Sequence, residues 1–284
     1  MASYAFRIVN VFTVDGDRFS GNPLCVFEDA RGLADGQMQA LARQMNLSET
    51  TFVLPPAGGG DAHVRIFTPG FEMPFAGHPT LGTASVVARG RDRVVLEMRA
   101  GLVEVTTRDG AYELRTAKPP ATRAVDGTRA ELARMLSLPE AAIAGEPLWV
   151  STGTEQLVIP IASREHVRAA RPVVDEMHRL ATSPTREEAM AYLWAAGTAD
   201  DPEHLVRFFF TIGSSVLEDP ATGSACANLG GYIVATRHAL PYQATLRQGE
   251  AVARPSRLHL RVDASGGIFV SGAVIELGRG VVDV

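Results

Sequence analysis

Cysteine is scarce in this sequence, with only Cys25 and Cys226 among 284 residues. So sparse a pair excludes a disulfide framework, and a zinc site would have to recruit partners from distant segments. The seven histidines include no HExxH motif or other tight ligand pair. Glycine-rich phosphate loops and a dinucleotide-binding fingerprint are absent as well. We therefore expect a reduced, cytoplasmic protein whose chemistry needs no metal and no cofactor.

Long apolar runs and an excess of positive charge are also lacking. No apolar stretch approaches ~20 residues, the length that spans a bilayer, and strand-like sequence follows the N-terminus without a signal-peptide pattern. The net charge is −5, from 27 basic and 32 acidic side chains, which argues against a nucleic-acid partner. What is present is ordinary globular composition, 46% hydrophobic and 21% charged. The length allows one large domain or two of ordinary size.

The hydrophobic pattern predicts many short strands and few helices. We expect strands at 4–12, 24–27, 50–54, 62–68, 94–98, 103–107, 112–117, 148–151, 156–161, 205–211, near 245, 258–262 and 269–277. Helices are predicted over 37–45, from about 78 to 89, through 136 and through 234. A capping box of Thr128 and Glu131 begins the third of these. The stretch 185–194 fits either a helix or a buried strand.

The junction between the first helix and the next strand carries a single carboxylate, Glu49. Asp35 is the expected N-cap of this helix, and Asn46 can adopt the left-handed conformation that ends it. Ser48 and Glu49 then occupy a tight turn. A carboxylate packed against Leu47 and its apolar neighbours is poorly solvated, which suits it to take and return protons. The simpler interpretation, a solvated glutamate or a cap partner, is open at this point.

Two further groups lie at predicted helix starts, where free N–H groups attract anions. Gly77 and His78 precede a helix with proline in its first turn, and Asp219 precedes the segment 220–224. Each has a plain structural alternative: His78 could bond a carbonyl oxygen, Asp219 could be an N-cap, and the small residues could serve close packing. The combination is more informative, because one glutamate, one histidine and one aspartate suit proton movement on a small anion.

A weak internal repeat relates the two parts of the chain. Arg65 begins a strand that leads to the first small-residue helix, and Arg207 begins one that leads to the second. We expect two similar halves, 1–118 and 119–284, with Lys118 starting the linker, although the final strand could return to the first half. Each half would curl a mixed sheet round one apolar helix, in an α+β fold, with both helix starts facing a central cleft.

Several long motifs, in order, resemble the phenazine-biosynthesis PhzF-like family over nearly the whole chain. They are residues 46–55 (NLSETTFVLP), 65–69 (RIFTP), 74–82 (PFAGHPTLG) and 218–225 (EDPATGSA), with 21–24 (GNPL) and 254–256 (RPS) in support. The resemblance implies the diaminopimelate-epimerase-like fold, a homodimer, a site between the halves and no cofactor. It is weakest between about 122 and 205.

The resemblance also implies a function in secondary-metabolite biosynthesis. The best understood activity of the family isomerises trans-2,3-dihydro-3-hydroxyanthranilate by moving a hydrogen between ring carbons. By this likeness Glu49 is the acid/base, His78 and Asp219 orient the substrate and assist proton transfer, and Gly77 and Ser224 contact the substrate. Ser48, Thr222 and Gly223 complete the expected substrate-binding residues, and the expected substrate is a small unsaturated, anionic amino carboxylate.

Two departures put the substrate in question, and two other functions stay open. The segment 208–211 lacks the proline expected after its strand, and Ala253 stands where a glycine often precedes the RPS motif. One alternative is an amino-acid racemase or epimerase with Glu49 opposite His78 or Asp219. Related epimerases use two cysteines at the helix starts, and none stands there in this chain. The other alternative is a non-catalytic small-molecule-binding protein.

Overall fold

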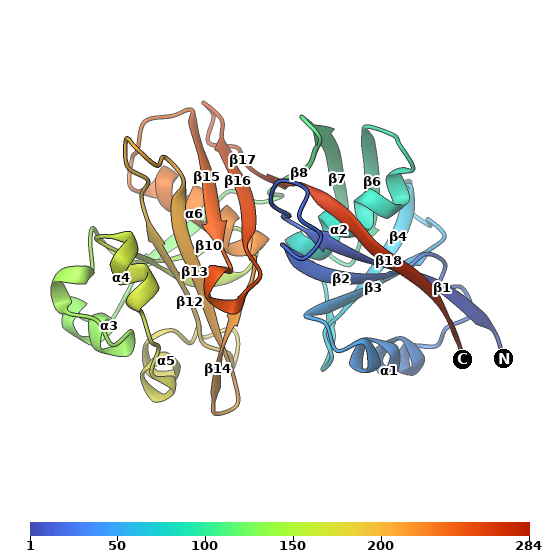
Figure 1. Ribbon diagram of the computed structural model, residues 1–284, viewed down its shortest axis with the longest axis horizontal. Helices are drawn as coiled ribbons and strands as arrows, with labels where there is room; N and C mark the ends of the chain where they lie inside the picture. The colour runs from blue at the N-terminus through green and yellow to red at the C-terminus, as the bar shows by residue number, and fades with distance from the viewer. The chain divides into compact units, whose positions relative to one another are not determined.

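The computed structural model describes residues 1–284 and divides them into two compact units (Figure 1). One unit contains Met1–Arg115 together with Ser271–Val284, and the other contains Thr116–Val270. The C-terminal residues join the first unit because β18 (Val274–Asp283) pairs antiparallel with β1 (Ser3–Val11). The two termini therefore lie side by side. None of the helices has the length and apolar character needed to cross a membrane.

The first unit is a mixed sheet packed round one apolar helix, α2 (Gly77–Ala88). Its other elements are β2 (Asn22–Phe27), α1 (Asp35–Met45), β3 (Glu49–Leu54), β4 (Ala62–Phe67), β5 (Glu72–Met73), β6 (Arg93–Met98), β7 (Gly101–Arg108) and β8 (Ala111–Arg115). The pairs β2–β3 and β4–β6 are parallel, and the other pairs of this unit are antiparallel. The first eight residues of α2 are all buried, as expected for a helix enclosed by strands.

Helix α1 ends as the sequence predicts but begins differently. Asn46 has φ 52° and donates its N–H to Ala42, which closes the helix. The prediction that Asp35 is the N-cap is wrong. The cap is Ala34, whose backbone N–H donates to the side chain of Gln37 at 2.9 Å. Asp35 is instead the first helical residue. Its carboxylate pairs at 2.6 Å with Arg65 of β4, a strand that follows later in the chain.

The glycine-rich loop between β3 and β4 is more than a plain hairpin end. The backbone N–H groups of Ala57, Gly58 and Gly60 donate to the carboxylate of Glu97 at 2.8, 2.7 and 2.7 Å. These backbone donors lower the pKa of Glu97, because they stabilise its charged form. The loop is therefore tied to β6 by a single side chain that sequence reasoning passed over.

The second unit has the same architecture round α6 (Gly223–Ala235). Its strands are β9 (Ala121–Ala124), β10 (Leu148–Ser151), β11 (Glu155–Pro160), β12 (Met190–Ala195), β13 (His204–Ile212), β14 (Ser215–Asp219), β15 (Tyr242–Gln248), β16 (Ser256–Val262) and β17 (Ile268–Gly272). Short helices α3 (Arg129–Met135), α4 (Arg164–Ala169) and α5 (Val174–Leu180) cover a second apolar cluster. The predicted capping box of α3 is present. The ambiguous stretch 185–194 ends in a strand, and α4 and α5 were not predicted.

The two units repeat one order of strand pairings. In the first unit, β1–β2, β2–β3, β3–β4 and β4–β6 are in turn antiparallel, parallel, antiparallel and parallel. The same order holds in the second unit for β10–β11, β11–β12, β12–β13 and β13–β15. The repeated arginines mark equivalent points. Arg65 forms a paired ion contact with Glu72 on the next strand, and Arg207 does the same with Glu218. The predicted internal repeat is thus a structural one.

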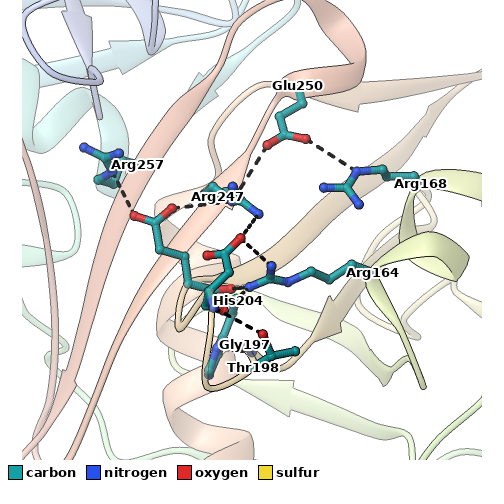
Figure 2. A network of polar contacts seen from close by, with 10 residues as sticks. Arg164, Arg168, Gly197, Thr198, His204, Arg247, Glu250 and Arg257 are labelled. Atoms are coloured by element: carbon teal, nitrogen blue, oxygen red, sulfur yellow. Dashed lines mark hydrogen bonds and ion pairs between the residues drawn. The ribbon is translucent and has the colours of Figure 1, made fainter.

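A network of ion pairs ties α4 to β15 and β16 within the second unit (Figure 2). Arg164 donates to the Asp201 carboxylate at 2.5 Å, which lowers the pKa of that carboxyl. Arg247 on β15 also reaches Asp201, at 2.9 Å, and Arg257 on β16 pairs with Glu203 at 3.1 Å. Asp201 and Glu203 both lie in the segment before β13, so these ion pairs hold that segment against α4, β15 and β16.

Candidate active site

Glu49 is the first residue of β3, directly after the turn that ends α1. β3 runs parallel to β2, and Glu49 lies opposite Leu24 in that register. The Glu49 side chain is 16% exposed, yet its Oε2 atom is buried and has no hydrogen-bond partner. A buried carboxylate oxygen without a partner is costly unless it has another task. The preceding residue, Ser48, is exposed.

His78 lies against Glu49. Its Nδ1 atom is 3.1 Å from Glu49 Oε2, although the contact does not meet the angular limits of a hydrogen bond. The imidazole is 4% exposed, and its Nε2 atom is buried without a partner. The structure therefore brings together two predicted residues, and each leaves one polar atom unsatisfied. Buried polar atoms without a hydrogen-bond partner are typical of a ligand-binding site.

The start of α2 adds donors beside this pair. Gly77 and His78 are its first residues, and no side chain caps the helix. The first N–H groups of a helix have no intrahelical partner, so they can receive an anion. Gly77 and His78 are both buried, so this helix start faces neither bulk water nor a capping side chain.

Asp219 and Thr222 are linked in the second unit. The hydroxyl of Thr222 donates to Asp219 Oδ2 at 2.5 Å. Gln248 Nε2 donates both to the Thr222 hydroxyl at 3.0 Å and to the Asp219 carbonyl at 2.9 Å. Thr222 is the N-cap residue of α6, but its side chain caps no helix N–H because it serves Asp219 instead. Gln248 is fully buried, and sequence reasoning missed it.

Gly223 and Ser224 begin α6, as Gly77 and His78 begin α2. Glu72 on β5 and Glu218 on β14 each stand five positions before the first residue of the following helix. Glu72 pairs with Phe67, and Glu218 pairs with Phe209. His78 and Ser224 are therefore equivalent positions. Ser224 Oγ accepts a hydrogen bond from Gln156 Nε2 at 3.0 Å.

The repeat also shows which residue of the second unit is equivalent to Glu49. Thr50 pairs with Phe67, and Ala191 pairs with the equivalent Phe209. The residue before Ala191 is Met190, the first of β12. Glu49 therefore corresponds to a methionine in the second unit, so the repeated fold carries one carboxylate at this position and not two.

The two cysteines are poor candidates for proton carriers. Cys25 lies in β2 and Cys226 within α6, and both are fully buried. Burial raises the pKa of Cys25 to about 12 and raises that of Cys226 as well. Thiols with such pKa values hold almost no thiolate at neutral pH. No group of three or more histidine, cysteine, aspartate and glutamate side chains lies close enough to hold a metal ion.

Comparison with known proteins gives a consistent result. The family described as phenazine biosynthesis-like protein (PhzC-PhzF) matches residues 9–275. An uncharacterized isomerase of Pasteurella multocida is 36% identical, covering 99% of this chain and 94% of the relative. The trans-2,3-dihydro-3-hydroxyanthranilate isomerase of Pseudomonas aeruginosa is 34% identical, covering 92% of this chain and 91% of the relative. The crystal structure of a PhzF-family protein of Bacillus anthracis covers 100% of both chains with TM-score 0.85 and 22% identity.

The chain is an isomerase with an α+β fold of two similar units, and it belongs to the PhzF family of phenazine biosynthesis-like proteins. The predicted family and fold class are thereby confirmed.

Proposed function

We propose that this isomerase moves a proton along a small unsaturated carboxylate of the trans-2,3-dihydro-3-hydroxyanthranilate type, with Glu49 as the acid/base. The observation that carries the proposal is the contact of 3.1 Å between Glu49 Oε2 and His78 Nδ1, at an uncapped helix start, with Glu49 Oε2 and His78 Nε2 buried and without a hydrogen bond. The activity of the Pseudomonas aeruginosa relative, a trans-2,3-dihydro-3-hydroxyanthranilate isomerase, supports the substrate class. Secondary metabolism is the proposed setting, and the homodimer and the cytoplasmic location stay predictions.

The proposed reaction needs no net change in atoms or electrons. The Glu49 carboxylate takes a proton from a carbon between a double bond and an electron-withdrawing group. The electron pair of the broken C–H bond enters the conjugated system, and the double bond shifts. The same carboxyl group then returns the proton to the carbon at the far end. His78 orients the carboxylate through their contact.

We assign Asp219, Thr222, Gly223 and Ser224 of the second unit to substrate binding in this reaction, and Ser48 and Gly77 of the first. The Asp219 carboxylate can accept from an amino or hydroxyl group of the substrate. The helix N–H groups and the Ser224 hydroxyl can donate to its carboxylate. Asp219 also assists proton transfer in the proposal.

Proton return from one face favours isomerisation over racemisation. Racemisation of one centre needs carriers on opposite faces, and the repeat offers a methionine where a second carboxylate would stand. The buried thiols do not replace it, since their pKa values are raised. No observation favours a racemase or a non-catalytic binder over the isomerase.

Product analysis in deuterated water tests the proposal. Wild-type protein is incubated with trans-2,3-dihydro-3-hydroxyanthranilate, and the product is analysed by NMR. We expect a shifted double bond with hydrogen or deuterium at the far carbon. Glu49→Gln should lower kcat by about 10²–10⁴-fold, the range lost with a general base, while Glu104→Gln, the matched exchange at an exposed position of β7, keeps full activity. Inversion of one centre without a double-bond shift would refute the proposed shift and identify a racemase or epimerase. Ligand binding by the wild type without any turnover would identify a non-catalytic binder.

A further inference from the structure

A chain of buried amide groups links the start of α6 to the turn between β10 and β11. Asn228 Oδ1 accepts from the backbone N–H and the hydroxyl of Thr152, both at 2.8 Å. Asn228 Nδ2 donates to the Thr154 carbonyl and to Gln156 Oε1, also both at 2.8 Å. Gln156 Nε2 then donates to Ser224 Oγ at 3.0 Å. Gln156 and Asn228 are 1% and 0% exposed.

The direction of every bond in this chain is fixed by two backbone groups. A backbone N–H can only donate and a carbonyl oxygen can only accept, so the N–H of Thr152 and the carbonyl of Thr154 set which end of the Asn228 amide faces each of them. The Nδ2 group of Asn228 therefore faces Gln156, which turns the Gln156 oxygen toward Asn228. The Gln156 Nε2 group is left facing Ser224.

Ser224 Oγ consequently accepts from Gln156 and keeps its own proton for another partner. Its oxygen makes no second hydrogen bond within the second unit. A serine hydroxyl is otherwise free to rotate and to act as donor or acceptor. Here the amide chain occupies the acceptor role and leaves the Ser224 hydroxyl, at the start of α6, as a hydrogen-bond donor.

The first unit shows that the fold does not require this polar chain. Strand registers and helix positions make Gln156 equivalent to Leu24, and Asn228 equivalent to Gly82. At that place Leu24 packs directly on the helix, and a Cβ added at Gly82 would lie 2.5 Å from Leu24 Cδ2. One unit thus fills the position with a leucine–glycine contact. The other buries two amides, which is costly unless every group is satisfied.

We propose that Gln156 and Asn228 are positioning residues that fix the Ser224 hydroxyl as a donor to an oxygen of the substrate carboxylate. This inference rests on the proposed function, because Ser224 was assigned there to substrate binding. A carboxylate only accepts hydrogen bonds, so a serine locked as a donor complements it, and the open N–H groups of α6 point to the same ligand class. Asn228 acts through Gln156, and Gln156 acts through Ser224.

A double-mutant cycle tests this dependence. We compare wild type, Gln156→Leu, Ser224→Ala and the double variant, with trans-2,3-dihydro-3-hydroxyanthranilate for kinetics and its aromatic analogue 3-hydroxyanthranilate for calorimetric binding. Ser224→Ala should raise KM and the analogue Kd roughly tenfold, as for one lost hydrogen bond to a charged group. Gln156→Leu should raise both by a smaller factor, because the hydroxyl remains but is free to rotate away, and neither variant should change kcat much. In the Ser224→Ala background, Gln156→Leu should change Kd less than about twofold. Gln243→Leu, the same exchange at an exposed site on β15, should change nothing.

Two outcomes would overturn the inference. The first is additive effects of the two variants on Kd, because Gln156 would then act without Ser224. The second needs no ligand: in ¹⁵N-labelled free protein, Ser224→Ala should shift the side-chain amide signals of Gln156, and unchanged signals would exclude the bond. If wild type fails to bind the analogue, the proposed substrate fails, while this spectroscopic comparison still tests the Gln156–Ser224 bond on which the inference depends. Loss of turnover in Glu49→Gln with analogue binding retained separates the chemical step from the positioning.

Discussion

Glu218→Gln should destabilise the second unit more than the equivalent Glu72→Gln destabilises the first. Both glutamates bind the repeated arginine of the preceding strand through two hydrogen bonds. Arg207 donates to Glu218 at 3.1 and 2.6 Å, and Arg65 donates to Glu72 at 2.8 Å twice. The pairs differ in burial, and burial decides what is lost when the carboxylate is removed.

The Arg207 pair is the more costly one to break. The two side chains are 10% and 8% exposed, so Glu218→Gln leaves a buried guanidinium without its counter-charge. Such a loss costs about 3–5 kcal/mol. Glutamine keeps one acceptor oxygen, and Arg207 still donates to the carbonyls of Val167 and Ala170 at 3.1 and 3.0 Å. We therefore expect a decrease in unfolding free energy at the low end of that range, about 3 kcal/mol.

The Arg65–Glu72 pair costs less to break, because Arg65 has a second carboxylate partner and contact with water. Its side chains are 17% and 18% exposed, and the guanidinium also pairs with Asp35, which is 84% exposed. Loss of Glu72 leaves Arg65 with a second carboxylate and access to water. The expected decrease for Glu72→Gln is about 1 kcal/mol, as for one hydrogen bond to a charged group that solvent partly replaces.

Tryptophan fluorescence distinguishes the two variants. Trp149 and Trp194 are the only tryptophans and lie in β10 and β12 of the second unit. Urea unfolding followed by fluorescence therefore reports on that unit, while circular dichroism reports on the whole chain. Glu218→Gln should shift the fluorescence transition strongly to lower urea. A shift for Glu218→Gln below about 1 kcal/mol, or an equal one for Glu72→Gln, would refute the reasoning from burial.

Four other results are expected. Ala253 has φ 55°, so Ala253→Gly should stabilise by about 0.5–1 kcal/mol in urea unfolding; Gly249 has φ 79° and an added Cβ would overlap two carbonyl oxygens, so Gly249→Ala should destabilise in the same assay. Backbone hydrogen bonding in the α3 cap lowers the pKa of Glu131 from 4.5 to about 2. The Glu131 carboxylate therefore contributes its full stabilisation of the fold above pH 4.5 and loses it as the pH falls toward 2. Over that pH range the urea midpoint should decline less steeply for Glu131→Gln than for wild type. Because burial raises the pKa of both thiols, Cys25 and Cys226 should resist iodoacetamide until urea unfolds the protein.

Local chemistry made part of the fold predictable from sequence. Asn46 ends α1 because its short polar side chain tolerates a positive φ, and the Thr128–Glu131 box begins α3 because both ends satisfy free N–H groups. The N-cap of α1 could not be predicted in the same way. Asp35 had a suitable residue type, but a charge partner on β4 competes for it.

The candidate site was predictable only where a residue type itself signals chemistry. Glu49 stood out as a carboxylate among apolar residues and His78 as a histidine at a predicted helix start, and the structure brings them into contact. Gln156 and Asn228 gave the same kind of signal, an amide within an apolar strand and an amide within a small-residue helix. Their meaning depends on the register between β11 and α6, which no local pattern contains. Gln248 was missed for the same reason, because it reaches Thr222 from a later strand.

The repeat supports the proposed one-base chemistry, because equivalent positions in the two units hold different residues. Two units with the same strand pairings need the same apolar packing, so differences between equivalent positions are free to serve function. Three such differences concern the site: Glu49 corresponds to Met190, His78 to Ser224, and Leu24 to Gln156. In the proposed reaction, Glu49 of the first unit is the proton carrier beside His78, and Ser224 of the second unit is a donor held in one orientation. In the proposed reaction one carboxylate takes and returns the same proton, and a second carrier at the equivalent position would offer a competing route.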